Sequence, residues 1–170
     1  MTTPATAPHS DDAMAVKLTD EDVRAALASS LGCQDIQVES WKQVSLMEDG
    51  RLGFLGDHFK VTATVRVPGD AEARDASLFV KALPRNPMAR DTVANSGAFK
   101  KEALFYKYLS SAMTAELRVD RPGFQPYVFP QCHGIKDDCL LLDDLGRDGF
   151  HGLGGRECMP IEHARLVRVV

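Results

Sequence analysis

Ten consecutive residues, from His58 to Val67, alternate strictly between polar and apolar side chains. Because successive side chains of a β-strand point to opposite faces, this alternation places every apolar residue on one face. The apolar residues are Phe59, Val61, Ala63, Val65 and Val67. The segment therefore predicts a half-buried antiparallel strand, which belongs in a sheet with one face packed on a core.

Further elements are expected on either side of this strand. Thr19 is suited to cap a helix with acidic residues in its first turn, and Gly32 is a natural end for it. Ser96 is suited to cap a long helix over 98–113, and residues 84–97 before it predict a loop with at most a short helical turn. Further strands are expected over 36–46, 77–83, 127–135 and 139–142. This order indicates an α+β fold, with one antiparallel sheet of about five strands, one long helix packed on it and an additional N-terminal helix.

Length and composition disfavour several classes of protein. A chain of 170 residues has the size of one domain, and its net charge of −4 without a basic run disfavours nucleic-acid binding. No apolar stretch reaches the ~18 residues of a membrane span. Residues 1–16 predict a disordered tail rather than a signal peptide, because they are rich in Thr, Ala, Pro and Asp. The four cysteines contain no Cys-x-x-Cys pair, so reduced thiols and a cytoplasmic location are expected.

Two charged residues stand where the pattern predicts apolar surroundings. Lys81 interrupts the apolar strand 78–83, and Glu102 lies on a helical stripe that continues through Phe105 to Leu109. An unpaired charge in such a place is costly, so we expect the Lys81 and Glu102 side chains to form an ion pair. The alternative is that both are surface charges whose aliphatic stems pack on the protein.

Three glycines, Gly50, Gly53 and Gly56, lie between the first two predicted strands. Glycine lets backbone amides approach a phosphate closely, although a hairpin loop is the commoner explanation of such a segment. No Gly-Lys-Ser/Thr follows, which excludes a Walker motif. The chain order is a glycine loop, a strand lysine, a helix glutamate and an apolar strand that ends in Asp143-Asp144-Leu145. This is the order of parts in the N-terminal lobe of a kinase.

Several stretches carry a more specific resemblance. They are Leu78-Phe79-Val80-Lys81-Ala82-Leu83-Pro84, Phe99-Lys100-Lys101-Glu102-Ala103-Leu104-Phe105-Tyr106, Leu140-Leu141-Leu142-Asp143-Asp144-Leu145, Gly56-Asp57-His58-Phe59 and Ile161-Glu162-His163-Ala164-Arg165-Leu166. As a set they resemble the ecdysteroid kinase-like (CHK kinase-like) family. That family looks like a branch of the aminoglycoside/choline phosphotransferases, which have a protein-kinase-like fold.

The resemblance implies a role for each matching residue. Lys81 would hold the α- and β-phosphates of ATP, and Glu102 would be its ion-pair partner. Gly53 and Gly56 would lie over the phosphates. The segment 142–145, with Asp143 and Leu145, would be the hinge that offers backbone groups to adenine.

The same resemblance implies a catalytic loop that this chain lacks. The His-Gly-Asp segment of the family has no counterpart here, and neither has the later metal-binding aspartate motif. No catalytic or metal-binding residue is therefore expected in the chain, and a Mg²⁺ site is expected only in a complete one. We expect a kinase-like N-lobe over 17–145 and, over 146–170, the hinge exit and first helix of a truncated C-terminal lobe.

The function expected from these features is ATP binding by the N-terminal lobe of a small-molecule kinase that phosphorylates a hydroxyl group. The fragment itself is expected to be inactive, and the sequence does not identify the small-molecule acceptor. One alternative is a non-catalytic interaction module that retains a kinase-like scaffold. Another, an α+β domain without a nucleotide function, holds only if Lys81 and Glu102 do not meet.

Overall fold

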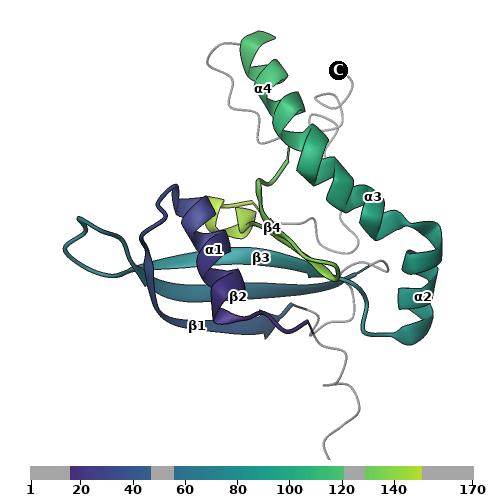
Figure 1. Ribbon diagram of the computed structural model, residues 1–170, viewed down its shortest axis with the longest axis horizontal. Coiled ribbons are helices and arrows are strands. Elements are labelled where there is room, and N and C mark those ends of the chain that lie inside the picture. The colour runs from purple at the N-terminus through teal and green to yellow at the C-terminus, as the bar shows by residue number, and fades with distance from the viewer. Residues whose placement is uncertain (1–15, 47–55, 121–128, 151–170) are drawn as a thin grey trace, which may run out of the picture.

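The computed structural model describes residues 16–46, 56–120 and 129–150. Within these ranges, five strands form one antiparallel sheet in the order β1-β2-β3-β5-β4 (Figure 1). The strands are β1 (Gln37–Ser45), β2 (Asp57–Arg66), β3 (Arg74–Ala82), β4 (Cys132–Ile135) and β5 (Cys139–Asp143). The expected α+β class with a five-stranded antiparallel sheet is therefore confirmed.

The helices lie before the sheet and between β3 and β4 in the chain. They are α1 (Asp20–Leu31), α2 (Pro87–Ser96), α3 (Ala98–Leu104), the π-helical segment η2 (Phe105–Leu109) and α4 (Ser110–Asp120), and a 3₁₀ turn, η3 (Leu145–Asp148), follows β5. None of the described helices is long and apolar enough to cross a membrane.

The alternation in β2 has the structural consequence that the sequence predicts. From Asp57 to Val65 every second side chain of β2 is buried, and the residues between them are partly exposed. Strand β3 repeats this pattern from Ala76 to Ala82. The register pairs Phe59 with Val80, so the buried residues of the two strands share one face.

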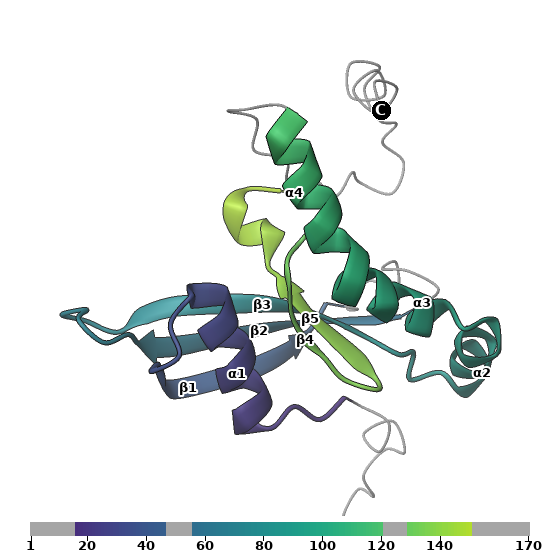
Figure 2. The same ribbon diagram turned by 45° about the horizontal axis from the view of Figure 1, so that its top comes forward.

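Helix α1 covers this buried face (Figure 2). It begins with the expected cap: the Thr19 hydroxyl accepts a hydrogen bond from the Asp22 amide, and the Asp22 carboxylate accepts one from the Thr19 amide. It ends at Gly32, whose φ of 65° is the left-handed conformation that glycine adopts without strain. The α1 residues buried against the strands are Val23, Ala26, Leu27 and Ala28.

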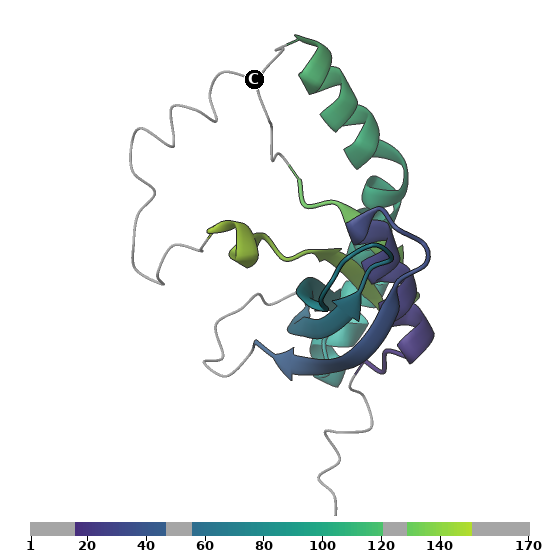
Figure 3. The ribbon, with the colours of Figure 1, turned by 90° about the vertical axis from the view of Figure 1, so that its left-hand side faces the viewer.

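The other face of the sheet remains more open. Cross-strand register places His58 opposite Lys81 and Lys60 opposite Phe79 on this face. Figure 3 shows α1 on one side of the strands and η3, in yellow-green, on the other. The chain therefore leaves β5 toward the face that carries Lys81.

The segment between β3 and the long helix differs from the prediction of a loop. Residues 87–96 form the ten-residue helix α2. The Asn86 side chain caps the helix by accepting a hydrogen bond from the Ala89 amide, and Pro87 occupies the first turn. Val93 is the buried residue of α2. The prediction of a loop was therefore wrong, because Asn86 and Pro87 are a helix start that it did not take into account. The expected cap of the long helix was wrong: Ser96 is the last residue of α2, and Gly97 is both the C-cap of α2 and the N-cap of α3. The Ser96 hydroxyl still accepts a hydrogen bond from the Ala98 amide at 3.3 Å.

The long helix also differs from the prediction, because it runs to Asp120 and contains the π-helical segment. The Ser110 amide bonds to the Phe105 carbonyl five residues earlier, so this turn contains more residues than an α-turn. As a result Ser110 is buried on the inner side, whereas Leu109 is 54% exposed. The predicted apolar stripe was wrong at Leu109, because an α-helical spacing does not continue across a π turn.

Some expectations lie outside the described residues. They are the tail over 1–15, Gly50 and Gly53 of the glycine loop, the strand start at Tyr127 and the final helix over 161–170. The described chain begins at Val16, which was expected to be the last residue of the disordered tail but is buried in the core together with Leu18.

Candidate functional site

The predicted ion pair between Lys81 and Glu102 is present. Lys81 Nζ donates to both carboxylate oxygens of Glu102, at 2.7 Å to Oε1 and 2.8 Å to Oε2. The alternation of β3 turns Lys81 away from the α1 core, and Glu102 comes from α3 on the same side of the sheet. The two side chains are 26% and 30% exposed, so water partly solvates a pair that the sequence predicted to be buried.

A pocket of about 440 Å³ lies beside this pair. Its walls come from β2, β3, the α3–η2 helix, the segment before β4, strand β5 and the segment that follows β5. The lining residues are His58, Phe79, Lys81, Glu102, Tyr106, Pro130, Leu142, Asp143, Asp144, Leu145, Gly146 and Phe150. Lys81, Glu102, Asp143 and Leu145, four of the residues expected at the site, thus lie around one cavity. Its volume falls within the usual range for small-molecule sites, roughly 300–1,000 Å³.

Gly56 stands immediately before β2 and is buried. A Cβ atom at this position would lie 2.8 Å from the Ala82 carbonyl oxygen and 3.6 Å from Lys81 Cε. Backbone therefore approaches backbone so closely that only glycine fits without a shift. The requirement at Gly56 is close packing against the end of β3, next to Lys81.

An anchor that the sequence did not reveal follows Gly56. The Asp57 carboxylate is 8% exposed and accepts hydrogen bonds from the amide and from Nε of Arg85, at 3.1 and 2.7 Å. The Arg85 guanidinium also lies 5.9 Å from the centre of the Phe59 ring. This contact ties the start of β2 to the chain just after β3, so it holds the end of the glycine loop beside Lys81.

Asp143 and Asp144 lie in the segment 142–145 that was expected to be the hinge, and their carboxylates point to opposite faces of the sheet. On the Lys81 face, Asp144 Oδ2 accepts hydrogen bonds from Lys60 Nζ at 2.8 Å and from the Ser77 hydroxyl at 2.7 Å. Burial raises the pKa of Asp144, but the hydrogen bonds from Lys60 and Ser77 outweigh it and keep the pKa below its ordinary value. Asp144 is therefore a fixed anion that joins the hinge to β2 and β3.

On the α1 face, a hydrogen-bonded chain holds Asp143. Its Oδ1 lies 2.6 Å from His133 Nε2, and its Oδ2 accepts the Gln131 amide at 2.8 Å. His133 Nδ1 lies 3.0 Å from the Ser29 hydroxyl of α1. Burial raises the pKa of Asp143, but the hydrogen bonds from His133 and Gln131 outweigh it and bring the pKa below its ordinary value. The carboxylate therefore stays ionised.

Both carboxylates are therefore held by other groups of the protein, Asp144 by Lys60 and Ser77, and Asp143 by His133 and the Gln131 amide. His133 belongs to the strand expected over 127–135 and does lie in β4, but its contact with Asp143 was not predicted. The pairing of β4 with β5 creates this contact, and a lone histidine in a strand does not signal it. One signal for these contacts was present in the sequence, the adjacent residues Asp143 and Asp144. Neighbouring residues of a strand point to opposite faces, so their carboxylates were bound to meet different partners.

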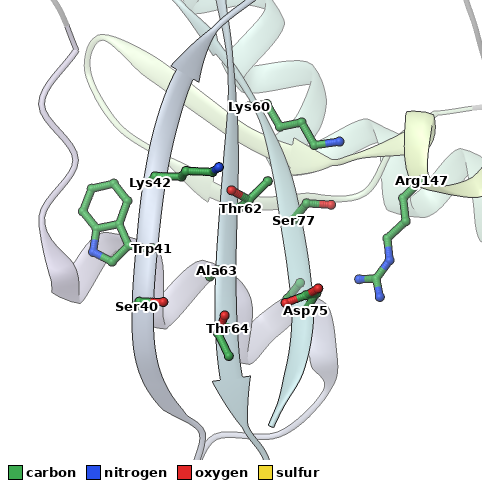
Figure 4. Close-up of a pocket in the computed structure, with 11 residues that line it drawn as sticks. Ser40, Trp41, Lys42, Lys60, Thr62, Ala63, Thr64, Asp75, Ser77 and Arg147 are labelled. Atoms are coloured by element: carbon green, nitrogen blue, oxygen red, sulfur yellow. The ribbon is translucent and has the colours of Figure 1, made fainter.

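A larger hollow of about 730 Å³ lies farther along the Lys81 face of the sheet. Figure 4 shows polar side chains that rise from β1, β2 and β3, with Arg147 reaching toward them from the segment after β5. The labelled polar members include Ser40, Lys42, Lys60, Thr62, Thr64, Asp75 and Ser77. This hollow is larger than the pocket beside Lys81, but neither Lys81 nor Glu102 lines it. We therefore place the candidate site at the smaller pocket.

A protein metal site needs several His, Cys, Asp or Glu side chains close together. In the part of the chain that the structure describes, no group of three or more His, Cys, Asp or Glu residues is arranged to hold a metal ion.

A five-stranded antiparallel sheet in which a strand lysine pairs with a helix glutamate is consistent with the N-lobe of a kinase-like phosphotransferase scaffold. The model of the ecdysteroid kinase-like family matches residues 53–168, which is more than half of the chain. The chain therefore belongs to the ecdysteroid kinase-like family. No curated protein and no solved structure matches it at a significant level.

Proposed function

We propose that this chain is the ATP-binding lobe of a small-molecule kinase that transfers the γ-phosphoryl group of ATP to a hydroxyl. The observation that carries the proposal is the Lys81–Glu102 ion pair on the wall of a pocket bounded by the hinge. A glutamate that contacts the ammonium with both oxygens fixes the lysine in one position. A lysine fixed in this way can hold the phosphates of a nucleotide.

The remaining roles follow from position around the pocket. Gly56 and Gly53 belong to the loop expected to cover the phosphates, and the close approach of Gly56 to Ala82 supports this for the end of the loop. The backbone of Asp143 and Leu145 is expected to hydrogen bond with adenine. The side chain of Asp143 is already bound by His133, so it supports the hinge rather than the ligand.

Phosphoryl transfer itself needs parts that this sequence does not contain. No His-Gly-Asp segment occurs in it. The positioned acceptor and the metal charge that dominate such catalysis are therefore expected to come from a complete C-terminal lobe. In the proposed division, residues 17–145 are the nucleotide lobe and residues 146–170 lead into the second lobe. Mg²⁺ would bind only where that lobe supplies ligands.

The proposal extends to kinship and location. We place the chain in the aminoglycoside/choline phosphotransferase group because the glycine loop, the lysine, the glutamate and the hinge segment follow one another in that order along the chain. A cytoplasmic location fits an ATP-binding protein and is supported by the free thiols of Cys33, Cys132 and Cys139, since thiols stay reduced there.

Titration calorimetry of the 170-residue chain with ATP tests the proposal. We expect ATP to bind, and Lys81→Ala to weaken binding at least about tenfold, because a charge-assisted contact to phosphate is lost. Lys42→Ala is the matched control, since Lys42 lies on the same face but lines the other hollow. Binding that Lys42→Ala reduces as much as Lys81→Ala would place the nucleotide elsewhere. A folded chain that binds no ATP would favour the interaction module, and turnover of ATP by the purified chain would contradict the expected inactivity.

A further inference from the structure

His58 of β2 lines the candidate site beside Lys81. It lies directly opposite Lys81 in the β2–β3 register and therefore points to the same face. Its ring packs on Phe79, with ring centres 5.3 Å apart and planes tilted by 33°. The side chain lines the pocket together with Lys81 and Glu102. A ligand in this pocket that contacts Lys81 Nζ therefore lies next to the strand position of His58.

The two ring nitrogens of His58 have different surroundings. Nδ1 is buried, and no atom of the described residues forms a hydrogen bond with it. A proton on Nδ1 would be an unsatisfied buried donor, which is unfavourable. The neutral ring therefore carries its hydrogen on Nε2, so Nε2–H is its available donor.

The charges around His58 also favour the neutral ring. Burial lowers its pKa, and the Lys81 ammonium on β3 lowers it further. The carboxylates of Asp57, the preceding residue, and of Glu102 on α3 act in the opposite direction but do not outweigh these effects. The other titratable residues in the pocket wall are Tyr106, Asp143 and Asp144. Burial raises the pKa of Tyr106, so its hydroxyl is neutral.

We propose that His58 binds a phosphate oxygen of the nucleotide as a neutral hydrogen-bond donor through Nε2–H, beside Lys81. The inference rests on the proposed function, because it concerns the same pocket and the same ligand. A neutral donor adds a hydrogen bond to the phosphate without placing a second positive charge next to Lys81. His58 would thus help the site to distinguish nucleotides from nucleosides, which offer no phosphate.

The tautomer can be measured on the ligand-free chain by long-range ¹H–¹⁵N NMR of the imidazoles, with His58→Gln to assign the signal. We expect the Nε2–H neutral pattern at pH 7 and a pKa below the ordinary value for histidine. An Nδ1–H pattern, or an imidazolium at pH 7, would overturn the proposal whether or not ATP binds.

Binding of ATP and of adenosine by variants tests the ligand. His58→Phe keeps the aromatic contact with Phe79 and removes the donor, whereas His58→Gln keeps a donor of similar reach. We expect His58→Phe to bind ATP about tenfold more weakly with adenosine unchanged, and His58→Gln to lose less. Thr64→Val, on the same face of β2 but outside the pocket, is the control and should leave both ligands unaffected.

The outcomes separate the two proposals. If the wild-type chain binds ATP and His58→Phe binds it equally well, the role of His58 is wrong while the ATP site stands. If His58→Phe weakens adenosine as much as ATP, the donor does not serve the phosphate. If the wild-type chain is folded and binds no ATP, the proposed function and this inference both fail.

Discussion

The two faces of the sheet are built from the same strands but meet different surroundings. On one face, Leu78 and Val80 are completely buried under α1 and belong to the main core. On the other face, their chain neighbours Phe79 and Lys81 are only partly buried and line a pocket. One strand therefore contributes to stability through one set of residues and to the candidate site through the alternate set. Substitutions of adjacent residues can separate the two contributions.

The largest expected effect is on the buried face. Leu78→Ala should lower the free energy of unfolding by about 3 kcal/mol, since it leaves a cavity in a fully buried site. Phe79→Ala should lower it by roughly 1 kcal/mol because its side chain is partly exposed, but it should weaken ATP binding. Urea denaturation and calorimetry measure the two effects. Equal losses of stability from both variants would contradict the distinction between the faces.

Two glycines sharpen the comparison, because an added methyl group would enter a different face at each. Gly56→Ala places Cβ 2.8 Å from the Ala82 carbonyl, so backbone must move and about 2 kcal/mol of stability should be lost. Gly134→Ala places Cβ 3.1 Å from the Leu141 Cδ1 atom, so a side chain rather than backbone must shift, and only by a few tenths of an ångström. We expect a smaller loss there, measured by the same denaturation experiment. A harmless Gly56→Ala would show that β2 and β3 are less tightly fixed at this end.

The Lys81–Glu102 pair should contribute less to stability than a fully buried pair would. A double-mutant cycle with Lys81→Ala and Glu102→Ala should give a coupling energy of about 1 kcal/mol, because both side chains remain about a quarter to a third exposed. The Arg66–Glu39 pair, 48% and 36% exposed with a 2.7 Å contact, is the control and should give less. A coupling of several kcal/mol for Lys81 and Glu102 would mean that the pair is more strongly desolvated than the exposed fractions indicate.

The smallest effects concern the hinge carboxylates, one on each face. The pKa values of Asp143 and Asp144 are lowered in the folded protein, so the unfolded chain binds more protons in acid. Their contribution to stability is therefore present above the unfolded pKa and is lost as the pH falls through the folded pKa. In wild-type protein, stability should decline from about pH 5 downward, and Asp143→Asn and Asp144→Asn should each flatten this decline by under about 1 kcal/mol. Unfolding measured from acid to neutral pH checks it, and unchanged slopes in both variants would contradict the assignment.

Local patterns determined much of this protein before any tertiary contact is considered. The period of two in 58–67 specifies which residues of β2 face the core, because side-chain direction in a strand depends only on position. Thr19 and Gly32 bound α1 because capping acts through neighbouring residues. The meeting of Lys81 and Glu102 was also predictable, since a charge within an apolar pattern needs a partner.

Only the tertiary structure decided the remaining features. The π turn moves the inner face from Leu109 to Ser110, and the spacing of apolar residues does not reveal it. The contacts of Asp57 with Arg85 and of His133 with Asp143 depend on which strands pair and in what register. The protonation of His58 depends on the burial of one ring nitrogen beside Lys81. Hydrogen bonding and desolvation depend on residues brought together from distant parts of the chain, so local periodicity cannot specify them.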